Sequence, residues 1–381
     1  MDYLDACYFC TTPYQMITSM IMCKNNREKA DIYIDPQFRQ AKLYADNLKK
    51  IGLFNRVSLV DTTGIDNHKN SNNTVIMHLG IAKKYFDVDK IAKRIVFPDT
   101  YYSKMYVSSK AYIGRMVYLY NLKHGIDTEL IYFDDGEGSY YNPSLTKAKN
   151  LDKIARYIAI GRKSLDKRPH SLYLFDPELY KSLNGANWSG NIYEIPRALF
   201  DSDMQNKVSK VFDFSEEDLI NEPVIILDVL KDEVHLGNSE KQKLISIYDM
   251  VRDAVSAENL IIKRHPRDTS EESSGFKYYK RFNMPFECLC ARMNMDKKVL
   301  IAISSTAVVV PKILLDKEPI VILLYRIINH LHLDSESFDK QNDFYNKCKS
   351  RYNDSSRFYI PETIDELKSI LEHVSSFCER C

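Results

Sequence analysis

Residues 128–138 read TELIYFDDGEG, an apolar run followed at once by three carboxylates and two glycines. The spacing of apolar residues over 105–123 predicts an amphipathic helix, and the run Thr128–Phe133 predicts a buried strand. A helix that leads into a short apolar strand is typical of α/β folds with parallel sheets. Ligands of such sheets bind beyond the carboxyl ends of the strands, which is where residues 134–138 begin.

The same alternation of strand and helix extends to both sides of this stretch. Before it, we expect strands at 7–10, 30–34 and 56–60 and helices at 13–23 and 37–51. After it come weaker strand patterns at 171–175 and 191–195. From residue 222 the rhythm resumes, with strands at 224–229, 260–264, 298–303 and 320–324 and helices at 241–255, 306–315 and 364–374.

The length predicts more than one domain. The chain has 381 residues, whereas single domains have about 100–200. We expect a first α/β domain over 1–205 and a second over 221–355, joined through a polar stretch within 197–221. The segment 356–381 predicts a C-terminal helix that packs back on the first domain.

Composition and charge exclude several classes of protein. Hydrophobic residues make up 44% and charged residues 28%, as in ordinary globular proteins. Lysine and arginine number 53 against 52 aspartates and glutamates, so no net charge attracts nucleic acid. The start, MDYLD, is acidic where a secretory signal carries basic residues, and no run of about eighteen apolar residues occurs. We therefore expect a cytoplasmic protein.

The cysteines form two C-x-x-C spacings, Cys7/Cys10 and Cys378/Cys381. Such spacings occur in zinc sites. However, Cys7 and Cys10 lie in an expected strand, whose period of two sends residues i and i+3 to opposite faces. Reduced core thiols are therefore the favoured interpretation, and we expect no metal site.

The acidic loop is the first candidate for catalysis. Asp134, Asp135 and Glu137 are close enough to repel one another, so one of them can hold a raised pKa and act as a base near neutral pH. Gly136 lets a ligand approach the backbone. The alternative is a solvated acidic turn, because Asp and Gly are ordinary turn residues.

A basic loop follows the strand expected at 260–264. Lys263, Arg264 and Arg267 surround His265, a composition suited to an anion. Pro266 restricts the backbone of His265 to an extended form and so fixes where the imidazole points. The alternative is a basic surface loop with an incidental histidine.

Ser304, Ser305 and Thr306 follow the next expected strand and precede a helix. Free backbone N–H groups, the helix dipole and adjacent hydroxyls can together hold a phosphate without a metal. The alternative is a plain helix cap, which Ser and Thr often provide. All three candidates follow strands, so we expect them at ligand-binding edges.

These motifs resemble those of bacterial sialyltransferases with the GT-B fold. Asp134–Gly136 is similar to their D/E-D/E-G motif, His265–Pro266 to the HP motif and Ser304–Thr306 to the S-S/T motif, in the same order. The opening CTTPYQ (10–15) and FDDGEG (133–138) also resemble glycosyltransferase family 52, which includes lipooligosaccharide and capsule sialyltransferases. This opening adds Thr12 and Gln15 to the expected substrate-binding residues. Polysialyltransferases share the three motifs.

The resemblance implies a fold and a reaction. The fold would be GT-B, with two Rossmann-like domains facing a cleft, the acceptor on the first and the nucleotide sugar on the second. The reaction would transfer sialic acid from CMP-sialic acid to a glycan hydroxyl, with inversion and without a metal or other cofactor. The product would belong to bacterial capsule or lipooligosaccharide biosynthesis, which leaves open peripheral attachment to the inner face of the membrane.

The resemblance also implies residue roles. Asp134 would accept the proton of the acceptor hydroxyl, and His265 would bind the CMP phosphate and protonate it as it leaves. Ser304 and Ser305 would bind the same phosphate. Asp135 and Glu137 would hold acceptor hydroxyls or raise the pKa of Asp134. Lys263, Arg267 and Arg264 would bind the donor carboxylate or solvate the loop.

Alternatives remain open at this point. They are a polysialyltransferase, another GT-B transferase that uses UDP-glucose or CDP-glycerol, and a nucleotide-binding assembly protein without catalysis. The acceptor glycan, the linkage position and the oligomeric state carry no motif in this sequence.

Overall fold

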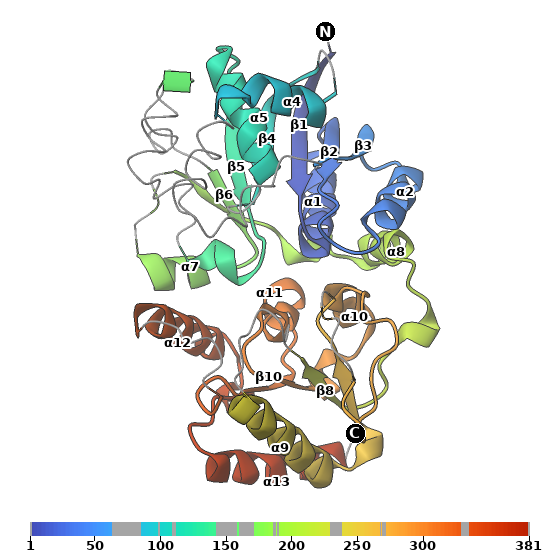
Figure 1. Ribbon diagram of the computed structural model, residues 1–381, viewed down its shortest axis with the longest axis vertical. Helices are drawn as coiled ribbons and strands as arrows, with labels where there is room; N and C mark the ends of the chain where they lie inside the picture. The colour runs from blue at the N-terminus through green and yellow to red at the C-terminus, as the bar shows by residue number, and fades with distance from the viewer. Residues whose placement is uncertain are drawn as a thin grey trace. The chain divides into compact units, whose positions relative to one another are not determined.

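The computed structural model describes residues 2–62, 85–97, 100–108, 112–141, 158–159, 171–185, 188, 190–228, 238–266, 268, 272–328 and 335–379. The chain forms two compact units, Met1–Val211 and Phe212–Cys381, so the division falls between the two expected domains. Each unit is built on one parallel sheet with helices connecting its strands (Figure 1). Two Rossmann-like α/β units are the architecture expected of the GT-B class.

The sheet of the first unit has seven described strands in the order β3-β2-β1-β4-β5-β6-β7, and every neighbouring pair is parallel. Their bounds are β1 (Asp2–Cys10), β2 (Ala30–Ile34), β3 (Arg56–Leu59), β4 (Thr100–Val107), β5 (Glu129–Phe133), β6 (Ser171–Leu174) and β7 (Ile192–Glu194). The strand order reverses between β1 and β4. At such a switch point the connecting loops diverge and leave a crevice at the carboxyl ends of the strands.

The described helices of this unit are α1 (Pro13–Asn26), α2 (Ala41–Ile51), α4 (Val88–Ile95), α5 (Tyr112–Lys123), α7 (Pro177–Asn184) and α8 (Ser202–Val211). Helix α5 packs tightly on the strands at the switch point. A Cβ added at Gly114 would lie 2.5 Å from Val107 Cγ1 and 3.1 Å from the ring of Phe9. Only glycine fits there, because real Cβ atoms do not approach other atoms so closely.

The helix expected over 105–123 is wrong in its first part. Residues Thr100–Val107 form β4, and α5 begins only at Tyr112. Met105 and Val107 fit the helical spacing as well as a strand. Strand pairing decides between helix and strand, because β4 lies along β1 over most of its length, with Tyr8 opposite Tyr106.

The polar stretch expected as a linker is also more ordered than its composition indicates. It contains α8, whose buried side chains Met204, Val208 and Val211 recur at helical spacing. This apolar stripe packs on α2. The boundary between the units therefore follows a docked helix.

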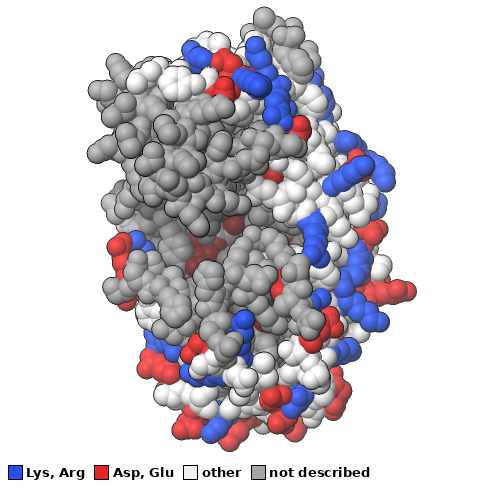
Figure 2. Space-filling model, in the orientation of Figure 1, with Lys and Arg blue, Asp and Glu red and all other residues white. Residues whose placement is uncertain are grey.

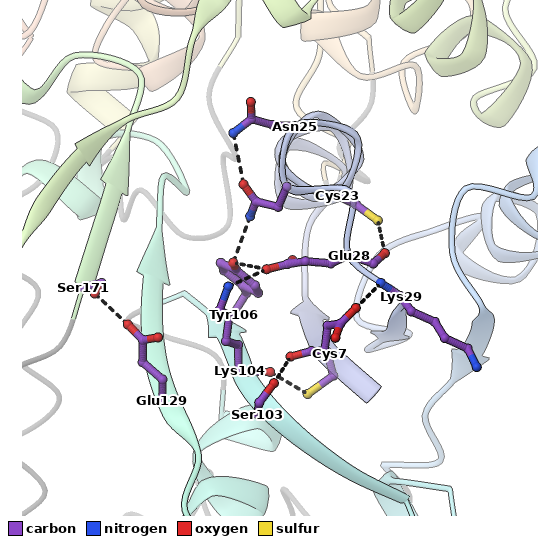
Figure 3. A network of polar contacts seen from close by, with 12 residues as sticks. Cys7, Cys23, Asn25, Glu28, Lys29, Ser103, Lys104, Tyr106, Glu129 and Ser171 are labelled. Atoms are coloured by element: carbon purple, nitrogen blue, oxygen red, sulfur yellow. Dashed lines mark hydrogen bonds and ion pairs between the residues drawn. The ribbon is translucent and has the colours of Figure 1, made fainter. Parts of the chain in front are cut away.

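A buried carboxylate fixes the connection between α1 and β2 at one face of the sheet. Glu28, whose side chain is 5% exposed, accepts hydrogen bonds from Tyr8 and Tyr106 at 2.8 Å and pairs with Lys104 at 3.1 Å. Figure 3 shows Glu28 directed toward Tyr106 and Lys104 of β4. The stacked rings of Tyr8 and Tyr106 lie 4.3 Å apart. This network ties β1 to β4, the pair that forms the switch point.

The sheet of the second unit has five described strands in the order β12-β11-β10-β8-β9, again all parallel. The strands are β8 (Val224–Leu227), β9 (Leu260–Lys263), β10 (Val299–Ala302), β11 (Ile320–Leu323) and β12 (Phe358–Tyr359). The helices are α9 (Asn238–Val255), α10 (Phe286–Arg292), α11 (Val310–Leu315), α12 (Ser335–Ser350) and α13 (Ile364–Cys378). Here the order reverses between β8 and β10. Strands β8 to β11 are buried throughout, as is typical of parallel sheets covered on both faces.

The C-terminal helix, expected within 356–381, belongs to the second unit. Helix α13 packs on α9, and the two lie side by side in Figure 1. Its buried residues Leu367, Leu371 and Val374 form one stripe. Thr363 caps its start by accepting the N–H of Glu366 at 3.2 Å. The stripe therefore finds its apolar surface within its own unit.

The surface carries both signs of charge. Figure 2 shows Lys and Arg interspersed with Asp and Glu on the coloured part of the face drawn. This mixture agrees with the near balance of 53 basic and 52 acidic residues. In the parts of the chain that the structure describes, every helix is too short or too polar to cross a bilayer.

Candidate active site

Asp134 stands directly after β5, in a loop whose shape depends on glycine. Gly136 has φ 95° and ψ −154°, a conformation that side-chain-bearing residues rarely adopt. This turn brings the Gly136 N–H within 2.9 Å of Asp134 Oδ1. The chain then continues as a short 3₁₀ helix, η1 (Glu137–Tyr140). Glycine is therefore needed here to form the turn that holds the carboxylate.

The Asp134 carboxylate is fully buried and fully hydrogen-bonded. Its exposed fraction is 0%. Oδ1 accepts the Gly136 N–H at 2.9 Å and the Tyr14 hydroxyl at 3.2 Å. Oδ2 accepts the Tyr140 hydroxyl at 2.7 Å and the Phe175 N–H at 3.2 Å. Two backbone groups and two tyrosines thus satisfy all four common acceptor positions of a carboxylate.

Burial raises the pKa of Asp134 to about 6, against hydrogen bonds from Tyr140, Gly136 and Phe175 that lower it. The charge of Asp135 raises it further, but as the smallest of the causes. Crowding of the carboxylates was the expected cause of a raised pKa. The direction agrees, but the main cause is desolvation. A carboxyl group with this pKa changes protonation state close to neutral pH.

The other two acids of the loop are half-buried. Asp135 Oδ1 accepts the Ser139 hydroxyl at 2.6 Å, and the Asp135 N–H donates to the same hydroxyl oxygen at 2.8 Å. Glu137 accepts a hydrogen bond from the Tyr141 hydroxyl. Both carboxylates remain closer to solvent than Asp134, so either can contact a ligand.

The β1–α1 connection lies beside the acidic loop. Thr12 caps α1 by accepting the Gln15 N–H at 3.2 Å, and Pro13 follows in the first turn. Gln15 is only 2% exposed, and its Oε1 accepts the Thr11 N–H at 2.6 Å. Thr12 and Gln15 therefore shape the start of the helix. Between them Tyr14 reaches Asp134, which joins two motifs 120 residues apart.

The basic loop after β9 divides into structural and accessible residues. Lys263 is 4% exposed and donates to the Phe282 carbonyl at 3.1 Å, and burial lowers its pKa to about 8. The Arg264 guanidinium lies 5.2 Å from the Phe282 ring and pairs with Glu272 at 3.3 Å. These contacts account for the positions of both side chains without a bound ligand. Neither residue therefore enters our proposal.

His265 and Pro266 are half-buried at the turn beyond β9. The His265 carbonyl accepts the Asp268 N–H at 2.9 Å, which closes the turn. Arg267, an expected substrate-binding residue, lies outside the described residues. Of the basic loop, His265 is the residue that combines partial exposure with a titratable ring.

The serine motif follows β10, with Ser304, Ser305 and Thr306 all half-buried. Ser305 is a cap whose Oγ accepts the Ala307 N–H at 3.2 Å. The helix expected over 306–315 is shorter than predicted. It consists of the 3₁₀ turn η6 (Thr306–Val308) followed by the α-helix Val310–Leu315. A helix this short has little dipole, so the hydroxyls and N–H groups must provide most of any phosphate binding.

The strand order brings the histidine and serine motifs to one edge of the second sheet. Strand β8 lies between β9 and β10, so the ends of all three meet there. Asp228 follows β8 and is 6% exposed. Its N–H donates to the Lys263 carbonyl at 3.0 Å, and its Oδ1 accepts the Tyr248 hydroxyl at 2.9 Å. The edge therefore carries a carboxylate between the two predicted phosphate-binding loops.

Sequence reasoning missed Tyr14, Tyr140 and Asp228. Tyr14 stands inside the stretch CTTPYQ that drew attention to Thr12 and Gln15, and Tyr140 lies six residues after Asp134. Asp228 lies inside the strand expected at 224–229, whereas β8 ends at Leu227, so a strand end could not have pointed to it. The tyrosines had no sequence signal either, because their roles depend on contacts made only in the folded chain.

The thiols lie in separate environments. Cys7 Sγ lies 3.8 Å from the Lys104 carbonyl and Cys10 Sγ lies 3.2 Å from Ser19 Oγ. Burial raises the pKa of Cys10 to about 12. Among the residues that the structure describes, no group of three or more His, Cys, Asp or Glu side chains could hold a metal ion. Cys381 lies outside them.

Comparison with known proteins finds likenesses among solved structures. No protein-family model and no curated protein sequence matches the chain. Among solved structures, the chain is similar to the crystal structure of CalG4, the calicheamicin glycosyltransferase. The TM-score is 0.45 and the sequence identity 8%, and the match covers 100% of this chain and 95% of CalG4. This likeness assigns no residue of the site.

Proposed function

We propose that this protein is a sialyltransferase that moves sialic acid from CMP-sialic acid to a glycan hydroxyl by a single inverting displacement without a metal. The observation that carries the proposal is the position of three motifs. The acidic, histidine and serine motifs each begin within two residues of the end of a parallel strand, where Rossmann-like sheets bind ligands. Their order along the chain is that of the bacterial sialyltransferases they resemble.

The acidic motif supports the acceptor half of the reaction. A base must hold its proton weakly enough to be ionised at working pH and strongly enough to remove a proton from a hydroxyl. A carboxyl group with a pKa of about 6 meets this requirement better than one with an ordinary aspartate pKa. In our proposal Asp134 is the final proton acceptor.

Residues of the second unit support the donor half of the reaction. A CMP leaving group carries a single phosphate, which hydroxyls, backbone N–H groups and an imidazolium can hold, whereas a diphosphate more often requires a divalent cation. The half-buried Ser304 and Ser305 and the His265 ring lie at one sheet edge. In our proposal His265 binds this phosphate and protonates it as the bond to the sugar breaks.

A transfer assay tests the proposed function. The full chain is incubated in excess EDTA with CMP-sialic acid, UDP-glucose or CDP-glycerol and a panel of lactosides and sialosides. We expect a sialylated product, identified by mass and NMR, from CMP-sialic acid only. Addition of a second and further sialic acids to a sialoside would make the enzyme a polysialyltransferase.

Two outcomes contradict the proposal. Transfer from UDP-glucose or CDP-glycerol, with none from CMP-sialic acid, assigns a different donor. Transfer that stops in EDTA and returns with added magnesium removes the metal-free mechanism. A heat-denatured sample of the same chain provides the background for spontaneous donor hydrolysis.

A further inference from the structure

The proposed proton acceptor has no surface that a substrate could touch. Asp134 is 0% exposed, and both of its oxygens are engaged. A general base must come within hydrogen-bond reach of the proton that it removes, either directly or through one intermediate. With the side chains as they stand, a glycan hydroxyl cannot contact this carboxylate. Another group must therefore connect the two.

Only one of the four described donors to Asp134 is suited to that task. Gly136 and Phe175 donate backbone N–H groups, which do not pass protons on. Tyr140 donates a hydroxyl but is itself 0% exposed, and the same hydroxyl oxygen accepts the Asp176 N–H at 3.3 Å. Tyr14 donates a hydroxyl, and with 8% of the whole residue exposed it is the more accessible of the two tyrosines.

The fold also places Tyr14 where a ligand is expected. It lies in the first turn of α1, directly after β1, and β1 and β4 form the switch point of the sheet. Asp134 follows β5, which lies on the far side of β4. The Tyr14 side chain thus links the switch point to the buried carboxylate, and the neighbouring Thr12 is exposed.

The backbone around Tyr14 is firmly held. Thr12 caps the helix, Pro13 restricts the first turn, and the Tyr14 carbonyl accepts the Thr18 hydroxyl at 3.1 Å. A relay requires this fixed geometry, because each proton must move along an existing hydrogen bond.

We propose, building on the proposed sialyltransferase function, that Tyr14 relays the proton from the acceptor hydroxyl to Asp134. The acceptor oxygen forms its bond to the anomeric carbon of the sugar as its proton moves to Tyr14 Oη. The Tyr14 proton moves to Asp134 Oδ1. The bond between the anomeric carbon and the phosphate oxygen breaks, and CMP leaves with its electron pair. Tyr14 ends with a hydroxyl, as it began, and Asp134 ends neutral. In this relay the Tyr14 hydroxyl contacts the acceptor, and Asp134 keeps the proton.

Tyr14→Phe tests the relay, because it keeps the ring and removes the hydroxyl. We expect kcat to fall by about 10²-fold, as for loss of a general acid–base group, with CMP binding to the second unit unchanged by calorimetry. Tyr180→Phe is the matched control. Within the described part of the chain, the buried Tyr180 hydroxyl has no hydrogen-bond partner, so the same chemical change should leave kcat at the wild-type value.

A double variant separates a relay from two independent effects. If the proton reaches Asp134 through Tyr14, Tyr14→Phe combined with Asp134→Asn should be slower than Asp134→Asn alone by no more than about twofold. Losses that multiply overturn the relay, as does wild-type turnover by Tyr14→Phe. An inactive wild-type chain would instead contradict the proposed function, so the two failures are distinguishable.

Discussion

Asp134→Asn is expected to lower kcat for sialic acid transfer by about 10⁴-fold, the upper end of the range for a general base, while CMP binding stays near the wild-type value. Asparagine has the shape of aspartate but cannot accept the proton. Each carboxylate oxygen of Asp134 also accepts one backbone N–H, from Gly136 or Phe175. The amide NH₂ of asparagine must therefore face one of these donors in either orientation.

That conflict makes a stability control necessary. Thermal unfolding and calorimetric CMP binding show whether Asp134→Asn is folded. Asp176→Asn is a matched variant, since Asp176 is also buried, follows β6 and caps α7 by accepting the Leu179 N–H at 3.0 Å. Asparagine caps helices as well as aspartate does, so this variant should keep its turnover. Wild-type turnover by a folded Asp134→Asn would remove Asp134 from the mechanism.

His265→Ala is expected to weaken CMP binding and to lower kcat by about 10²–10³-fold, as for loss of one group that stabilises developing charge. In our proposal, the His265 side chain contacts the phosphate before the reaction and stabilises it more strongly as the negative charge grows. The turn should survive, because its described hydrogen bond uses the His265 carbonyl and the Asp268 N–H. Calorimetry with CMP and steady-state kinetics measure the two effects separately.

His124→Ala is the control for loss of a histidine. His124 lies at the end of α5 in the first unit, with 43% of its side chain exposed, and pairs with Asp89. It should leave both binding and turnover unchanged. If His265→Ala behaved in the same way, the histidine motif would have no part in donor binding.

Most of the fold could be predicted from the sequence because its strands are short apolar runs. The strand expected at 30–34 is β2 within the same bounds, and those at 260–264 and 320–324 are β9 and β11 within one residue. β4 was missed because Met105 and Val107 fit a helical spacing as well as a strand. Its pairing with β1 joins residues far apart in the sequence. Hydrophobic periodicity does not carry that information.

The candidate site could be predicted only in part. Asp134 was identified by its place after a strand, which is a local signal. Its complete burial and its contact with Tyr14 are not local, since the two residues are 120 positions apart. The cause of its raised pKa was therefore misjudged. Crowding of carboxylates is visible in the sequence, whereas desolvation depends on what packs around the loop.

The helix that follows the serine motif is a second feature that the sequence predicted only in part. The sequence predicts one helix from residue 306, and the structure has a 3₁₀ turn before an α-helix of six residues. Pro311 lies in the first turn of that α-helix, where its missing N–H costs nothing. Pro311, expected in the interior of a helix, thus lies at the start of one.

The pH dependence of kcat tests most directly the claim that Asp134 receives the proton. Because burial raises the pKa of Asp134 to about 6, the carboxylate is ionised above that pH and protonated below it. With saturating donor and acceptor, kcat should be half-maximal near pH 6 and fall as the pH is lowered further. In Tyr140→Phe, which removes a hydrogen bond that lowers this pKa, the fall should begin at a higher pH. A wild-type kcat that stays constant down to about pH 4, the ordinary range of an aspartate, would contradict the account.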